Sequence, residues 1–168
     1  KAQLLELYAR CLRDQDLFEQ AARAYISSGE AAIYKSEADS AYFLAGVLFL
    51  KADKKNAAQA AWHRIRPHVR HGRLADDILW YSAWYYYRHQ SWNMAAERFL
   101  TLSRKYPSRM RGQAAQYWLA RTLERLGCQL KAQEHYLALA AGPGPDYYRF
   151  LSLKRLRRLN PQGRWVNH

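Results

Sequence analysis

The sequence has little cysteine, few acidic residues and no long apolar run. Its longest apolar stretch, residues 41–50, is shorter than the roughly 20 residues that a helix needs to cross a bilayer, so no transmembrane segment is predicted. The two cysteines, Cys11 and Cys128, fall in the first and last copies of an internal repeat. In a stack of helices each about 10 Å across, that separation excludes a disulfide, and both are predicted to be free or packed thiols.

Sequence motifs typical of catalysis are also absent. The chain contains no Gly-rich phosphate loop and no Cys/His signature of a nucleophile. His63, His68 and His71 occur close together, but no carboxylate or cysteine stands beside them at metal-ligand spacing. Asp76 and Asp77 are adjacent, at a predicted helix start where they suit the helix dipole. We therefore predict no catalytic residue, no metal and no cofactor for this chain.

Basic residues outnumber acidic ones by 27 to 14, which gives a formal net charge of +13. A helical stack does not need such a charge to stay in solution, so an anionic partner is indicated. Nucleic acid, a membrane surface, an acidic protein and an acidic polymer such as the peptide stems of peptidoglycan all fit. Because no recognised nucleic-acid module occurs and the charges are spread over loops, nucleic acid is the weakest of these candidates.

The sequence does contain a repeat of 37 residues. Residues 76–107 show its form, which is two amphipathic helical patterns joined by a polar turn at residues 88–91 and ended by Pro107. Sliding the chain by 37 residues aligns five columns in four copies without an insertion. The columns are Ala9/Gly46/Ala83/Ala120, Leu12/Phe49/Tyr86/Leu123, Ala21/Ala58/Ala95/Ala132, Tyr25/Trp62/Phe99/Tyr136 and Ser28/Ile65/Leu102/Leu139.

These columns have a physical explanation. A small residue in the first helix and an alanine in the second let the two helices cross closely, and the following aromatic residue fills the space beside the crossing. Such a pair cannot bury its apolar face alone, so the copies stack. We predict an all-α fold, a right-handed α-superhelix of stacked helix pairs, as one solenoid domain over residues 1–159. Its parts are repeats at about 2–38, 39–75, 76–112 and 113–145, a last helix at 146–159, and a tail or linker at 160–168.

The order of residues within one copy resembles the tetratricopeptide repeat. Ala83, Tyr86, Ala95, Phe99 and Pro107 match its pattern of small, aromatic and proline positions. The period differs, at 37 residues rather than about 34, which predicts longer helices or turns than in the consensus.

A second aromatic face lies beside the core face of the third copy. It carries Trp80, Trp84, Tyr87 and Arg88, and the tetratricopeptide resemblance implies that it belongs to the concave surface. Aromatic rings exposed there would stack on sugar rings, bases or a partner helix. Alternatively, the same rings pack against neighbouring helices as part of the core. The sequence leaves both interpretations open.

The fourth copy and the last helix carry a more specific resemblance. Its residues are Ala-Gln-Tyr-Trp-Leu-Ala-Arg at 115–121, Glu124, Gly127, Asp-Tyr-Tyr at 146–148 and Lys-Arg-Leu at 154–156. Together they resemble the superhelical region of soluble lytic murein transglycosylases, over roughly residues 76–159. The resemblance implies a periplasmic protein that binds or guides peptidoglycan strands. It also implies a set of ligand-binding residues on the concave face: Trp80, Trp84, Tyr87 and Tyr117 for sugars, with Arg88, Arg121 and Arg125 for peptide carboxylates.

The lysozyme-like catalytic domain of that family has no counterpart in this sequence. Its glutamate is followed by serine, whereas none of the seven glutamates here precedes a serine, and its Gly-Leu-Met-Gln run is missing. Glu124 shares a helix face with Arg121 and Arg125, so it is predicted to be charge-paired rather than a general acid. The chain begins at Lys1 inside a helical pattern, without an initiator Met or a signal peptide, so we expect it to be a segment of a longer protein.

Two functions are compatible with these observations. One is a non-catalytic superhelical domain of a lytic transglycosylase-like protein that binds or guides peptidoglycan. The other is a tetratricopeptide-type scaffold whose groove binds an acidic protein partner. A basic stretch before the third copy is either a solvated loop or an anion contact, and it contains Arg64, Arg66, His68, Arg70, His71 and Arg73.

Overall fold

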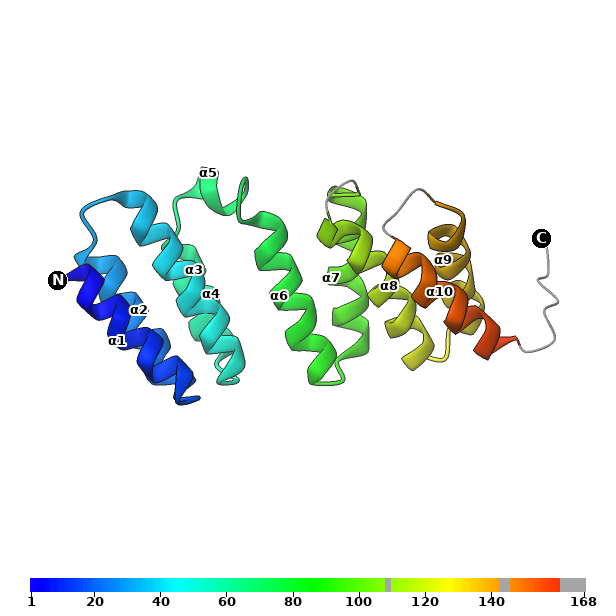
Figure 1. The fold of residues 1–168 in the computed structure, drawn as a ribbon, viewed down its shortest axis with the longest axis horizontal. Helices are drawn as coiled ribbons and strands as arrows, with labels where there is room; N and C mark the ends of the chain where they lie inside the picture. The colour runs from blue at the N-terminus through cyan, green and yellow to red at the C-terminus, as the bar shows by residue number, and fades with distance from the viewer. Residues whose placement is uncertain (108–109, 143–145, 161–168) are drawn as a thin grey trace. The chain divides into compact units, whose positions relative to one another are not determined.

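The structure is a computed structural model that describes residues 1–107, 110–142 and 146–160. Within these residues every regular element is an α-helix (Figure 1), as the repeat predicts. The helices are α1 (Ala2–Asp14), α2 (Phe18–Ala31), α3 (Lys35–Lys51), α4 (Lys55–His63), α5 (Pro67–Arg70), α6 (Ala75–Arg88), α7 (Trp92–Lys105), α8 (Met110–Arg125), α9 (Gln129–Ala141) and α10 (Asp146–Leu159). The predicted tail at 160–168 lies outside the described residues, apart from Asn160.

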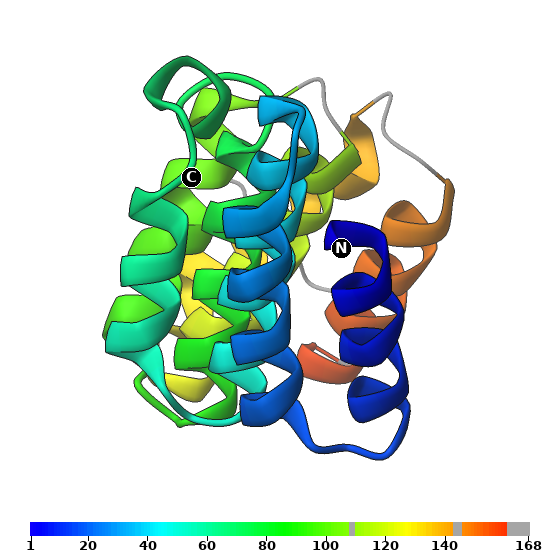
Figure 2. The ribbon, with the colours of Figure 1, turned by 90° about the vertical axis from the view of Figure 1, so that its left-hand side faces the viewer.

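The helices form two compact units, Lys1–Tyr81 and Ser82–His168, and the boundary falls inside α6. In the first unit, α1 and α2 lie side by side and run in opposite directions (Figure 2), and α2 packs on α3. In the second unit, α8 packs on α7 and α9, and α10 packs on α9 and α8. Consecutive helices therefore pair as the repeat predicts, although α3, α6 and α8 each begin slightly before the predicted start of their repeats.

Four of the five columns aligned by the repeat are buried in every copy and form the cores of these units, whereas Tyr86 and Leu123 of the fifth are partly exposed. The alanines of the second helices have no exposed area, and the aromatic residues that follow them are at most 5% exposed. These residues are Ala21, Ala58, Ala95 and Ala132, with Tyr25, Trp62, Phe99 and Tyr136. The one polar member of the columns, Ser28, is also buried, and its hydroxyl donates a 3.0 Å hydrogen bond to the Ala2 carbonyl. The polarity of Ser28 is thus satisfied inside the core.

The turn between the two helices of a pair has the same conformation in all four pairs. One residue in each turn has a φ between 55° and 76°, and the amide of the next residue donates to a carbonyl five residues earlier at 2.8–3.0 Å. The residues with positive φ stand 37 apart and are Asp16, Asp53, Gln90 and Gly127. This is a Schellman ending, which satisfies carbonyls at the end of the first helix. A residue other than glycine adopts it at a cost of roughly 1 kcal/mol.

The helix crossing of the second pair differs from the others in the sizes of its residues. Gly46 stands where the other pairs have alanine, and Trp62 stands where they have tyrosine or phenylalanine. A Cβ atom on Gly46 would overlap the indole ring of Trp62. The Trp62 Nε1 donates a 3.2 Å hydrogen bond to the Phe43 carbonyl, which fixes the ring. The indole ring of Trp62 therefore fits because Gly46, opposite it, lacks the methyl group that alanine has in the other pairs.

A one-turn helix, α5, lies where the sequence predicts an inter-repeat loop. It begins at Pro67, a residue suited to the first position of a helix. The Asp39 carboxylate, 2% exposed, accepts hydrogen bonds from the Arg66 amide at 3.0 Å and from Arg66 Nε at 2.8 Å. Arg64 pairs with Glu30 at 2.5 Å. Two basic residues of this stretch are thus held by acidic residues of the same unit, and the loop prediction is corrected only at Pro67–Arg70, where α5 lies.

Replacing Gly46 with alanine is expected to destabilise the chain by about 2 kcal/mol, because the added methyl group overlaps Trp62 in a close-packed core. Adding Trp62→Phe recreates the combination of Ala83 and Phe99 and should make the double variant more stable than Gly46→Ala alone. Denaturant unfolding of the parent, both single variants and the double variant measures the coupling. Simple additivity of the two changes would contradict the packing assigned to this crossing.

Replacing Gln90 with glycine is expected to stabilise the chain by about 0.5–1 kcal/mol, since glycine adopts a positive φ without strain. Gly127→Ala, at the same position of the next pair, should destabilise it by about 1 kcal/mol. The new Cβ at 127 meets no atom within 4 Å, so only the backbone conformation is tested. Thermal unfolding compares the two variants, and effects of the same sign would show that the turn is not as described.

Candidate functional site

Basic residues are concentrated in the second unit. Residues 82–168 contain 15 Lys and Arg against four Asp and Glu, a formal net charge of +11. Residues 1–81 contain 12 against 10, a net charge of +2, and the two values together account for the +13 of the chain. An anionic partner is therefore attracted chiefly by the second unit.

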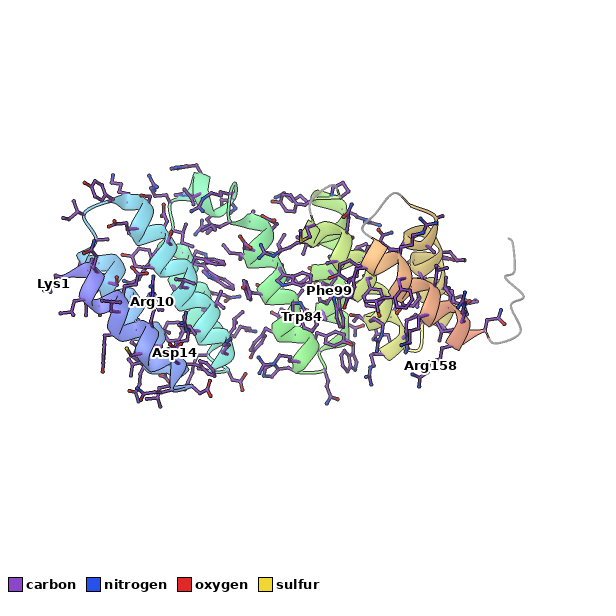
Figure 3. The ribbon with its side chains drawn as sticks, in the orientation of Figure 1. Lys1, Arg10, Asp14, Trp84, Phe99 and Arg158 are labelled. Carbon is purple, nitrogen blue, oxygen red and sulfur yellow. The ribbon has the colours of Figure 1, made fainter. Side chains whose placement is uncertain are left out.

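The second unit contains a continuous cluster of aromatic rings. Trp84 of α6 contacts Phe99 of α7 at a centroid distance of 6.1 Å (Figure 3) and Trp118 of α8 at 4.5 Å. Tyr87, one turn later on α6, lies 5.4 Å from Trp84 and 5.6 Å from Trp118. Aromatic rings prefer such edge-to-face contacts. Of the two interpretations that the sequence left open, the core role is thus observed for Trp84, which links α6 to α7 and α8.

The partly exposed edge of this cluster is called here the aromatic–arginine surface, and it consists of Tyr87, Trp92, Trp118 and Arg125. Trp92, at the start of α7, lies 5.1 Å from Tyr87. The Arg125 guanidinium lies 5.8 Å from the centre of the Trp92 ring. The three rings are partly exposed and Arg125 is exposed. Such a surface combines ring stacking with a positive charge, so it suits a ligand that has flat apolar faces and anionic groups.

The structure brings together only part of the predicted ligand-binding set. Tyr87 and Arg125 belong to the aromatic–arginine surface, and Trp84 contacts two of its rings. Arg88 is exposed at the end of α6. Trp80 is partly exposed and lies in the part of α6 that belongs to the first unit.

Tyr117 and Arg121 are positioned differently from the expectation. Tyr117 is 4% exposed, and its ring lies 5.7 Å from Tyr136 and 5.6 Å from Tyr148 of α10. A ring so enclosed cannot stack on a ligand, so the expected sugar-binding role of Tyr117 is corrected. Arg121 is partly buried, with its Nε 3.6 Å from a carboxylate oxygen of Glu124.

Sequence reasoning did not assign a site role to Trp92 or Trp118. Trp92 follows the turn at Gln90, and the 37-residue alignment places unrelated residues at its position, namely Phe18, Lys55 and Gln129. Trp118 is the neighbour of Tyr117 in the sequence, and the rotation of α8 decides which of the two rings reaches the surface. The abundance of aromatic residues in the third and fourth copies was the only feature of the sequence that pointed to Trp92 or Trp118 as site residues.

Glu124 is the centre of an ion-pair network in the second unit. Its carboxylate accepts hydrogen bonds from the Tyr136 hydroxyl of α9 and from two nitrogens of Arg155 of α10, whose Nε lies at 3.1 Å. The side chains of Glu124 and Arg155 are 12% and 19% exposed. The prediction that Glu124 is charge-paired is confirmed, with Arg155 rather than Arg125 as its main partner.

The charge state of Glu124 follows from this network. Burial raises the pKa of the Glu124 carboxyl, but hydrogen bonds from Arg155 and Tyr136, with the charges of Arg155 and Arg121, lower it by more. The pKa therefore lies below its ordinary value, and the side chain is a carboxylate at neutral pH. A general acid requires the opposite shift. The physical role of the network is to hold α8, α9 and α10 together.

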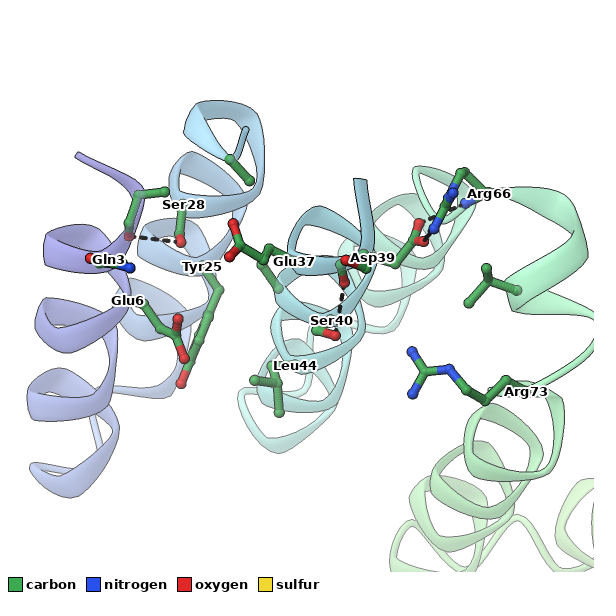
Figure 4. Close-up of a pocket in the computed structure, with 15 residues that line it drawn as sticks. Gln3, Glu6, Tyr25, Ser28, Glu37, Asp39, Ser40, Leu44, Arg66 and Arg73 are labelled. Atoms are coloured by element: carbon green, nitrogen blue, oxygen red, sulfur yellow. Dashed lines mark hydrogen bonds and ion pairs between the residues drawn. The ribbon is translucent and has the colours of Figure 1, made fainter. Parts of the chain in front are cut away.

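A hollow of about 600 Å³ lies in the first unit beside α3 (Figure 4). Glu6 of α1 and Tyr25 of α2 lie on one side of α3, and Arg66 and Arg73 lie on the other. Arg66 is occupied by its pairing with Asp39, at 2.7 Å from Nη2 to Oδ2. Because acidic and basic groups both line this hollow, it does not favour an anionic ligand in the way that the second unit does.

Within residues 1–107, 110–142 and 146–160, no group of three His, Cys, Asp or Glu side chains is placed to hold a metal ion. In the same part of the chain, no helix is long and apolar enough to cross a membrane. Cys11 and Cys128 are both free and exposed. Comparisons with protein-family models, curated proteins and solved structures found no match for the chain.

Glu124→Gln is expected to destabilise the chain by about 3 kcal/mol at pH 7, because it leaves the Arg155 charge inside the unit without its counter-ion. The Glu124 pKa is lowered on folding, so its stabilisation is complete above the unfolded pKa of about 4.3 and is lost as pH falls through the folded pKa. The difference between parent and variant should therefore shrink below about pH 4. Urea unfolding at pH values from 3 to 7 measures it.

Two further variants control this measurement. Glu97→Gln removes an exposed carboxylate of the same unit and should give only a small difference from the parent at every pH. Adding Arg155→Met to Glu124→Gln removes the unpaired cation and should not destabilise further. A difference for Glu124→Gln that does not depend on pH would contradict the assigned ion pair.

Proposed function

We propose that this chain is a non-catalytic helical-repeat domain that binds peptidoglycan strands through the aromatic–arginine surface. The observation that carries the proposal is the contact of Arg125 with Trp92, one of three partly exposed rings that lie together in a unit of net charge +11. Sugar rings have apolar faces that stack on aromatic side chains, and the peptide stems supply carboxylates. The resemblance of the fourth repeat and last helix to lytic transglycosylases supports this ligand over other anionic polymers.

In this role the chain holds and orients a strand, and any cleavage takes place elsewhere. Glu124, one of the residues that carry this resemblance, is a paired carboxylate and holds helices together. The proposed ligand contacts are Tyr87, Trp92 and Trp118 for sugar faces, with Arg125 for a carboxylate. A periplasmic location is part of the same proposal, because peptidoglycan lies there in the family that the chain resembles.

An acidic protein partner is the competing function, and the charge of the second unit favours it as well. The two functions differ in what they require of the rings. A strand of sugars requires stacking at Trp92, whereas attraction to an acidic protein by charge alone survives the loss of that ring. The contribution of Trp92 therefore separates them.

Purified sacculi should pellet the chain at low salt, and Trp92→Ala and Arg125→Ala should each weaken retention about tenfold, the equivalent of about 1.4 kcal/mol. Arg157→Ala is the matched control for Arg125, because it removes the same charge from an exposed position on α10. Trp84→Ala controls for packing and should lower the unfolding temperature, since Trp84 contacts Phe99 and Trp118.

Two outcomes would overturn the proposal. The parent chain could fail to pellet with sacculi even at low salt, where electrostatic attraction is strongest. Alternatively, Trp92→Ala and Arg125→Ala could bind as well as Arg157→Ala, which would leave only a general attraction of charge. In the second case, the attraction by charge alone would favour the scaffold function instead.

A further inference from the structure

The second unit also has a hollow, which lies among α7, α8 and α9. Its lining includes none of the residues of the aromatic–arginine surface. Its volume is about 610 Å³, within the range of small-ligand and side-chain pockets. Its apolar lining comes from Leu100 of α7 and from Leu119 and Leu123 of α8. Leu100 and Leu123 are partly exposed, so a ligand in the pocket would touch them.

Charged and polar side chains surround this leucine floor. Arg104 of α7 and Lys131 of α9 are exposed, and neither has an ion-pair partner among the residues that the structure describes. His135 of α9 also lines the pocket. Its pKa is lowered chiefly by burial and also by the charge of Arg104, with Glu134 opposing, so it is neutral near pH 7. Glu97 is the one acidic side chain of the lining.

We propose that this pocket binds an acidic peptide segment of a partner protein. One or two leucine-like side chains of the segment would rest on Leu100, Leu119 and Leu123. Its carboxylates would lie opposite Arg104 and Lys131, which supply the positive charge at the pocket. The site is separate from the proposed peptidoglycan surface, so it does not depend on that function.

A fatty acid, like an acidic peptide, combines apolar groups with a carboxylate. The residues that line the pocket favour the peptide. The leucine floor comprises three side chains, which match one or two short apolar groups better than a long acyl chain. An acyl chain would also cover Glu97 and Gln116 without offering them a hydrogen bond. A peptide offers backbone N–H groups to Glu97 and backbone N–H and C=O groups to Gln116. The three leucines and the polar side chains around them therefore match the apolar side chains and the polar backbone of a peptide.

Binding is tested with a fluorescein-labelled peptide of about twelve residues, composed of Glu, Asp and two leucines, whose anisotropy is measured with the full chain. A second probe replaces both leucines with serine and keeps every charge. The first probe should bind at least about tenfold more tightly than the second, because only the first places apolar groups on the floor. Changing the probe rather than Leu100 or Leu119 avoids any loss of folding.

The charge requirement is tested with two matched double variants. Arg104→Glu with Lys131→Glu reverses the charges at the pocket, and Arg157→Glu with Arg158→Glu makes the same change in net charge on the exposed face of α10. Binding of the leucine probe should fall at least about tenfold more in the pocket variant than in the α10 variant. Circular dichroism checks that both variants remain folded.

Each alternative result overturns the proposal. Equal affinity for the leucine and serine probes would mean that the floor is not used. Equal losses in the two double variants would mean that the peptide senses only the overall charge. If the leucine peptide does not bind, and decanoate displaces a fluorescent fatty acid from the chain, the pocket would be assigned to a fatty acid. None of these results bears on retention by sacculi, so the two proposals can fail separately.

Discussion

The close crossing of two helices at a pair of small residues is the contact on which both units depend. Each alanine of the second helices is fully buried, and a large ring lies beside it with almost no exposed area. Dispersion contacts between such closely packed atoms are individually weak and sum to a large term, so the crossing tolerates little change in volume. Gly46 and Trp62 show this constraint most directly, because the larger ring occurs only opposite the residue without a side chain.

A different interaction closes the second unit. There the last helix contributes Arg155, which reaches Glu124 of α8, and the same carboxylate accepts the Tyr136 hydroxyl of α9. Leu156 of α10 joins Ala132, Tyr136 and other residues in the apolar core of these helices. The polar network and the apolar core therefore join the same three helices, α8, α9 and α10, and share Tyr136, so both hold α10 in place. This arrangement gives the Glu124 carboxylate a structural role.

The repeat made the helix pairs and the core predictable, because a column of four similar residues is a stronger signal than any single residue. The same reasoning could not find α5, because Arg66, the residue just before that helix, is held by Asp39, which lies 27 residues earlier in the sequence. It paired Glu124 with neighbours on its own helix, whereas the main partner lies 31 residues away. Tyr117 was expected at the surface because helical spacing alone does not reveal that Tyr148 of a later helix covers it.

The identical turns inside the helix pairs have a consequence for how such a chain can change in length. Each turn contains a single residue of positive φ and no spare residue, and one added residue would rotate the following helix by about 100° about its axis. That rotation would turn the alanine and the ring away from the crossing. The connections between pairs differ in conformation while keeping the same length, as α5 between α4 and α6 shows. An added residue is therefore expected to do less harm in a connection between pairs than in a turn within a pair, because it leaves the crossing of each pair intact.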